Sequence, residues 1–196
     1  MKKDKQLAAI RDYAFQLFNA DVTGHDFFHM ERVVNLVEQI AREENADRFI
    51  CEAAAWLHDV GDKKLFKNPA QATENMHLFL DSISMEEAHI TVIDTIINSI
   101  SYSKGRIPET LEGKVVQDAD RLDAIGAIGI ARTFAYGGAN HQMIHQPGVT
   151  FTSIQHFYDK LLKLKDLMHT ETAKNIAAER HQFMEKFLEQ FNKEWN

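Results

Sequence analysis

The sequence contains little cysteine, little proline and no long hydrophobic run. One cysteine and three prolines occur among 196 residues. The single thiol, Cys51, cannot form an internal disulfide and is typical of a reducing compartment. No window approaches the roughly 18 consecutive apolar residues that a membrane-spanning helix requires. We therefore expect a cytoplasmic protein that neither spans a membrane nor depends on disulfides.

Positive charge is also in short supply. Twenty-two Lys and Arg residues stand against 29 Asp and Glu residues, which gives a formal net charge of −7. Because duplex DNA and RNA require a broad basic surface, duplex nucleic acid is not expected as a partner. A small anionic ligand is compatible with this balance, since a local basic pocket can lie on an acidic protein. Histidine, by contrast, is abundant: ten occur, where ordinary usage gives about four.

Apolar residues recur at helical spacing along almost the whole chain, and no strand or hairpin pattern is present. The spacing predicts three helices over about 7–18, 30–41 and 47–60. A fourth, short helix is expected after Asn68–Pro69, because Asn caps helices and Pro suits their first position. Ser84 and Glu87 have the spacing of a capping box, which predicts a fifth helix reaching about Ile100.

In the second half of the chain, the helical pattern continues from Glu109 to about Ala135 despite Gly126 and Gly129. An irregular stretch over 137–150 follows, which could close over a substrate. Two more helices are expected over about 153–168 and 170–195. We predict an all-α fold in one compact domain (1–196), with a core over about 20–135 and a C-terminal helical extension over about 150–196.

His58 and Asp59 stand at the end of the third predicted helix. Adjacent helical residues point about 100° apart, so these two can share a metal ion only where the helix is ending. His29 supplies a candidate ligand from the second helix. It heads an otherwise apolar stripe of that helix, so its imidazole points inward and needs a partner.

A fourth ligand could come from Asp118, Asp120 or Asp123, which lie close together in a helix rich in apolar residues. Burying several carboxylates is costly without a compensating positive charge, and a divalent cation would supply it. Two imidazoles and two carboxylates suit Mn, Fe, Co, Ni or Zn better than Ca. Water in the remaining coordination positions is a nucleophile at neutral pH.

Three segments, 24–29, 57–64 and 118–126, together resemble the HD-domain superfamily of metal-dependent phosphohydrolases, and within it the small bacterial YpgQ-like subgroup. The resemblance covers nearly the whole chain and implies an HD-domain helical bundle. It also implies one divalent ion per chain held by His29, His58, Asp59 and Asp120. The Ala-Asp-x-Leu context selects Asp120 for the last position. Mn is the expected metal, with Fe, Co, Ni, Mg or Zn as alternatives.

The resemblance further implies hydrolysis of phosphate ester or anhydride bonds. In the YpgQ-like subgroup this is nucleotide pyrophosphohydrolysis, which converts an NTP or dNTP to nucleoside monophosphate and pyrophosphate. The alternatives are another nucleotide phosphohydrolase (nucleotidase, phosphodiesterase or alarmone-type hydrolase) and a non-catalytic regulator that binds metal or nucleotide. A two-iron oxygenase is disfavoured, because residues 98–101 lack the histidine expected there in binuclear relatives. Both a monomer and a homodimer are compatible with the sequence.

Two carboxylates are the expected catalytic groups: Asp59, as a ligand, and Asp62, three residues later. Asp62 resembles in its offset an acidic residue of the alarmone-hydrolysing HD enzymes, and a carboxylate there could act as general base. The alternative for Asp62 is a turn or capping role after Gly61. Lys63, which follows at once, could offset the charge of a transferring phosphoryl group, or it could belong to a solvated basic loop.

Two further residues are candidates for substrate binding. His25 precedes His29 by one helical turn and could reach a substrate phosphate or the leaving group. Asp123 lies three residues beyond Asp120 and hence on nearly the same helix face. It could contact either a ribose or a histidine that lies behind the metal ligands.

Overall fold

The computed structural model describes residues 2–19, 26–100 and 106–195. Helices dominate these residues, and the only β-bridge among them joins Met143 and Thr152. The prediction of an all-α fold is confirmed. No helix in the described ranges is both long and apolar enough to cross a bilayer.

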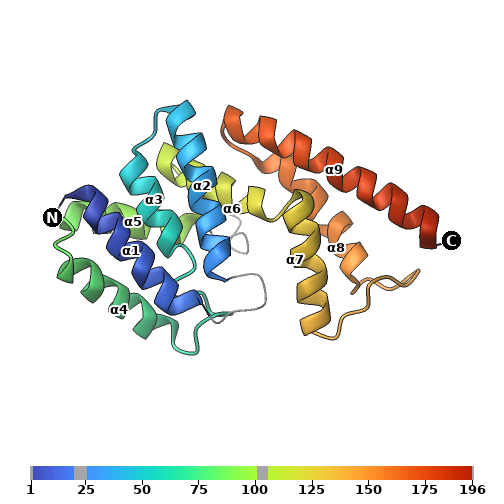
Figure 1. Cartoon of the computed structure of the whole chain (residues 1–196), viewed down its shortest axis with the longest axis horizontal. Helices are drawn as coiled ribbons and strands as arrows, with labels where there is room; N and C mark the ends of the chain where they lie inside the picture. Colours follow the sequence, from blue (N-terminus) through green and yellow to red (C-terminus); the bar gives the residue numbers. More distant parts are fainter. Residues whose placement is uncertain (1, 20–25, 101–105, 196) are drawn as a thin grey trace.

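Two helices, α2 (Phe27–Glu44) and α6 (Leu111–Asp123), run through the middle of the molecule (Figure 1). On the side of the N-terminus lie four helices: α1 (Lys3–Phe18), α3 (Arg48–Leu57), α4 (Pro69–Ser82) and α5 (Glu87–Ile100). On the side of the C-terminus lie α7 (Gly126–Ala139), α8 (Ser153–Asp159), the 3-10 helix η2 (Leu161–Leu167) and α9 (Glu171–Trp195).

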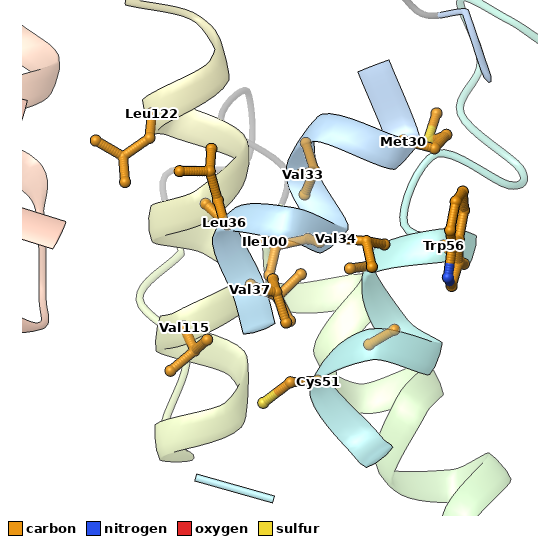
Figure 2. Close-up of a cluster of buried hydrophobic side chains, with 14 of the residues drawn as sticks. Met30, Val33, Val34, Leu36, Val37, Cys51, Trp56, Ile100, Val115 and Leu122 are labelled. Carbon is orange, nitrogen blue, oxygen red and sulfur yellow. The ribbon is translucent and has the colours of Figure 1, made fainter. Parts of the chain in front are cut away.

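The core forms where α2 packs between α3 and α6 (Figure 2). Val33 and Val37 are one helical turn apart, so both side chains point inward, and both are fully buried. Val115 and Leu122 of α6 meet them from one side, and Cys51 of α3 lies on the other. Each buried aliphatic side chain contributes about 1.5–3 kcal/mol relative to leaving it in water. This packing determines where the first turn of α2 and the end of α3 lie.

The start of α4 follows the sequence signal. The Asn68 side chain accepts a hydrogen bond from the amide of Gln71, and Pro69 occupies the first helical position. The predicted capping box at Ser84 is wrong. Ser84 has a φ of 55° and ends α4, where its amide donates to Asp81 and the Met85 amide donates to Leu80. The fifth helix begins only at Glu87.

The predicted continuous helix from Glu109 to Ala135 is also wrong, because the chain turns after α6 and starts α7 at Gly126. Gly126 has a φ of 78°, which favours glycine. A Cβ on Gly129 would clash with the carbonyl oxygen of Ala124, the residue that follows α6, so glycine also permits this close approach. The predicted helix over 153–168 is also interrupted: Lys160 separates α8 from the 3-10 helix η2.

Helix α9 is attached to α6 through polar contacts as well as apolar packing. The buried carboxylate of Asp118 accepts hydrogen bonds from the amides of His169 and Thr170 and from the Thr170 hydroxyl, at 2.8–3.0 Å. The guanidinium of Arg180 donates to the carbonyl of Leu122 at 2.6 Å. Donors at the start of α9 are therefore satisfied by a side chain of α6.

Candidate metal centre

The two candidate histidines stand at the start of one helix and the end of another, and each makes a local hydrogen bond. His29 lies in the first turn of α2, where its amide donates to the capping carboxylate of Asp26 at 2.7 Å. His58 follows the last residue of α3, and its Nδ1 donates to the carbonyl of Ala55 at 2.8 Å. A carbonyl only accepts, so Nδ1 of His58 carries the hydrogen and Nε2 keeps a lone pair.

Two carboxylates face these Nε2 atoms. Nε2 of His58 lies 3.5 Å from Asp59 and 3.7 Å from Asp120. Nε2 of His29 lies 3.8 Å from Asp59 and 3.6 Å from Asp120. These separations are too long for hydrogen bonds. They match ligands that share one ion, because ligands about 2.0–2.2 Å from a metal lie about 3–4 Å from one another.

The residues fit a divalent cation. Nε2 of His58 is buried and, within the described part of the chain, has no hydrogen-bond partner. Burial acts to lower the pKa of His58, but the charges of Asp59 and Asp120 outweigh it and raise the pKa. The cluster therefore favours a positive charge among its members. Ligand atoms of His29, His58 and Asp120 all lie within 4.8 Å of one another, and these three residues could hold a metal ion.

Asp123 contacts His29 on the far side of the imidazole ring. Its Oδ2 lies 2.7 Å from Nδ1 of His29, and Arg32 and Arg132 both donate to the same carboxylate. Burial opposes ionisation, but the hydrogen bonds from His29 and Arg32 hold the pKa of Asp123 well below its usual range. The side chain is only 2% exposed. The predicted partner of Asp123 was a ribose or a histidine behind the ligands, whereas in the structure it is His29, itself a candidate ligand.

The remaining predicted residues border the cluster or lie outside the described ranges. The amide of Asp62 donates to the carbonyl of Asp59 at 3.1 Å, and its Oδ1 accepts from the amide of Lys64 at 2.7 Å. The turn-capping contact considered for Asp62 is therefore present, and its catalytic role stays a prediction. Lys63 is exposed. His25 lies outside the described residues.

Three basic residues near the cluster were not predicted. Arg32 and Arg132 come from α2 and α7 and meet at Asp123. Lys160 stands between α8 and η2, where burial lowers its pKa and the charges of Asp120, Lys64 and Arg132 also act on it. Arg32 could have been found, because it lies one helical turn from His29. Nothing in the sequence connects Arg132 or Lys160 to the metal ligands.

Other candidates have different surroundings. Asp118 was one of three alternatives for the last ligand. Its carboxylate instead accepts hydrogen bonds from the amides of His169 and Thr170, just before α9. His145, in the loop that was expected to close over a substrate, packs edge-on against Phe191 and Trp195 at the end of α9. Closure of that loop stays a prediction.

Comparisons with known proteins identify the family. The sequence model of the HD domain family matches residues 26–125. YpgQ of Bacillus subtilis is 39% identical over 198 residues, which cover 99% of this chain and 96% of YpgQ.

Solved structures agree over the full length. The structure of YpgQ in complex with ADP has a TM-score of 0.87 and 38% identity, covering 99% of this chain and 97% of that one. An HD-superfamily hydrolase from Bacillus thuringiensis has a TM-score of 0.83 and 42% identity, covering 100% and 99%. A protein from Lactobacillus plantarum has a TM-score of 0.89 and 42% identity, with the same coverage.

Proposed function

Because the chain belongs to the HD domain family, we propose that it is a metal-dependent phosphohydrolase that acts on a nucleotide. The observation that carries the proposal is the convergence of His29, His58 and Asp120 on one small volume. We assign Asp59 as the fourth ligand, since its two oxygens face the two imidazole rings. A mixed nitrogen and oxygen set of this kind suits Mn among the divalent metals, with Fe, Co, Ni, Mg or Zn as alternatives.

A divalent ion bound there supplies a Lewis acid that lowers the pKa of water and offsets phosphate charge. The protein has to orient that water and accept its proton. We assign this task to Asp62, whose amide hydrogen bond to Asp59 keeps it close to a ligand. Asp120 is 33% exposed and Asp59 is 15% exposed, so the cluster is reached from the side of Asp120.

Basic residues border the same region. Lys63 and Lys64 follow the HD dipeptide in an exposed turn, and the charges of Asp120, Lys64 and Arg132 all act on Lys160. A transferring phosphoryl group carries negative charge on its non-bridging oxygens, which cations of this kind stabilise. The basic border lies on a chain of net charge −7, a combination that favours a small anion over a polyanion. The ADP complex of YpgQ supports a nucleotide.

The reaction that we propose is pyrophosphohydrolysis of an NTP or dNTP. Water attacks the α-phosphorus, the bond between that phosphorus and the bridging oxygen breaks, and pyrophosphate leaves with the nucleoside monophosphate. A nucleotidase would release orthophosphate instead. A non-catalytic regulator would bind the nucleotide and release nothing, so the products separate these functions.

The test is a panel of ribo- and deoxyribonucleotides, each with Mn, Co, Ni, Mg or Zn, in which orthophosphate and pyrophosphate are measured separately. We expect equal amounts of monophosphate and pyrophosphate with Mn. Asp62→Asn keeps an acceptor for the Lys64 amide but binds a proton poorly, so kcat should fall by about 10²–10⁴-fold. Asp94→Asn, in the His77–Asp94 pair between α4 and α5, is the matched control and should retain kcat.

Three results would contradict the proposal. Turnover at the wild-type rate by metal-free Asp59→Ala would exclude the metal mechanism. Binding of nucleotides without turnover of any would favour the regulator. A content of two iron ions per chain would return the oxygenase to consideration.

A further inference from the structure

A buried ion-pair cluster lies behind His29, on the side opposite the candidate ligands. Oδ2 of Asp123 lies 2.7 Å from Nδ1 of His29 and 2.6 Å from Nη1 of Arg132. Nε of Arg32 donates to Oδ1 at 2.7 Å, and its Nη2 donates to Oδ2 at 3.1 Å. Four donor groups from two helices, α2 and α7, therefore converge on the carboxylate at the end of α6.

This arrangement determines which nitrogen of His29 carries the hydrogen. A neutral imidazole has one N–H, which can reside on either nitrogen. A carboxylate that accepts from two guanidiniums cannot donate to the ring, so at the 2.7 Å contact the hydrogen resides on Nδ1. Nη1 of Arg132 lies farther from Nδ1, at 3.2 Å, and its shorter hydrogen bond, at 2.6 Å, goes to Oδ2 of Asp123. The lone pair is then on Nε2, the atom that faces Asp59 and Asp120.

We propose that Asp123, held in place by Arg32 and Arg132, is a positioning residue that keeps His29 in the tautomer and orientation needed to bind a metal ion. This inference rests on the metal centre proposed above. Carboxylates that orient a ligating histidine typically change metal affinity by about 10–100-fold when they are removed. Contact with substrate is an inadequate explanation for Asp123, since its side chain is 2% exposed.

The two histidines differ in how they are oriented. Nδ1 of His58 donates to the backbone carbonyl of Ala55, which no side-chain substitution removes. Nδ1 of His29 depends on a side chain, and that side chain depends on Arg132 of α7. The family match ends at residue 125, so α7 contributes to the metal centre from beyond it. Substitutions around Asp123 should therefore affect the His29 side of the centre selectively.

The decisive variant is Asp123→Asn. Asparagine has one acceptor oxygen, which the two arginines compete for, and its NH₂ group then faces Nδ1 of His29. We expect the hydrogen to move to Nε2, where it blocks metal binding. Long-range ¹H–¹⁵N spectra of the metal-free, ¹⁵N-histidine-labelled full chain should show this change of tautomer. Mn²⁺ affinity, measured by titration calorimetry, should fall by about 10–100-fold.

Arg132→Lys is the second variant, because it keeps a positive charge next to the carboxylate. This variant should fold even if Asp123→Asn does not. We expect its Mn²⁺ affinity to be severalfold lower than that of the wild type. Asp118→Asn is the matched control: it replaces a buried carboxylate of the same helix whose partners belong to the start of α9. It should retain both the His29 tautomer and the Mn²⁺ affinity.

The inference is overturned if Asp123→Asn and Arg132→Lys keep the Nδ1–H tautomer of His29 and bind Mn²⁺ within twofold of the wild type. In that case the cluster would serve stability alone. The two proposals fail in distinguishable ways. A wild-type chain that binds no Mn²⁺ would refute the metal centre, whereas the tautomer is measured on metal-free protein and still decides whether Asp123 orients His29.

Discussion

Helix α6 presents carboxylates to two different regions of the molecule. Toward the C-terminal helices, Asp118 accepts from backbone amides of His169 and Thr170 and thereby holds the start of α9. Toward α2 and α3, Asp120 faces two imidazoles at distances too long for hydrogen bonds. The first carboxylate has its donors in the protein, whereas the second, together with His29 and His58, could hold a cation.

The comparison teaches that burial of a carboxylate does not by itself indicate a metal site. Asp118 is more buried than Asp120, yet Asp120 is the better ligand candidate. What differs is the donor set, because amide hydrogens satisfy a carboxylate completely and imidazole lone pairs do not. The predictions below test this division of α6, from the largest expected effect to the smallest.

Asp120→Ala should have the largest effect and should affect function only. Loss of a ligand removes several kcal/mol of transition-state stabilisation, so nucleotide turnover should fall by about a thousandfold. Asp120 is 33% exposed, so the midpoint of thermal unfolding of the metal-free protein should stay within about 2 °C. Scanning calorimetry measures the unfolding midpoint, and a pyrophosphate assay measures the rate of nucleotide turnover. A large drop in the unfolding midpoint would show that Asp120 also serves the fold.

Asp118→Asn should have the opposite effect, on stability rather than function. Asparagine turns an NH₂ group toward donors that need an acceptor, which should cost about 2–4 kcal/mol of unfolding free energy. For a chain of this size the midpoint of thermal unfolding should fall by about 5–15 °C. The rate of nucleotide turnover below that midpoint should be unchanged. A proportional loss of turnover would mean that the two faces of α6 are not independent.

Glu44→Gln tests the same attachment of α9 from α2 and should have the smallest effect. Glu44 accepts from the amide and the hydroxyl of Thr172 at 2.9 and 2.7 Å, and these hydrogen bonds lower its pKa. A lowered pKa in the folded state stabilises the protein above the ordinary glutamate pKa, and this contribution disappears as the pH falls through the lowered value. The wild type should be more stable at pH 7, by less than about 1 kcal/mol.

The pH dependence supplies the check. Denaturant unfolding at pH 7 and at pH 3 should show a difference between Glu44→Gln and the wild type that shrinks at the lower pH. A difference that grows on acidification would contradict the assignment, because it would require a raised pKa for Glu44.

Much of the fold could be predicted because apolar spacing and helix caps are local signals. The start of α4 at Asn68 follows from two adjacent residues. The break at Gly126 was missed, since glycine costs only about 1 kcal/mol within a helix and the side chain that leaves little room for a Cβ there, Arg180, comes from the distant helix α9. Ser84 was misassigned because a residue between two helices can end one or begin the next.

The candidate site likewise contains residues that the sequence could identify and residues that it could not. The residues proposed as ligands lie in three short motifs, and the resemblance carried by those motifs identified them. For Asp123 the sequence left a ribose and a histidine behind the ligands as alternatives, and it did not identify His29 as the partner. Arg132 and Lys160 come from beyond the helix break, and they reach the site only through the arrangement of α7, α8 and η2. Long-range contacts of this kind leave no periodic signal in a single sequence.

The two tryptophans of the chain give each region its own fluorophore. Trp56, in α3, is 5% exposed and stacks on Phe27. Trp195 ends α9 and is 46% exposed. In a Trp195→Phe variant, emission therefore comes only from the packed core two residues before His58. In a Trp56→Phe variant, it comes only from α9. Fluorescence of the two variants can follow release of α9 separately from opening of the core.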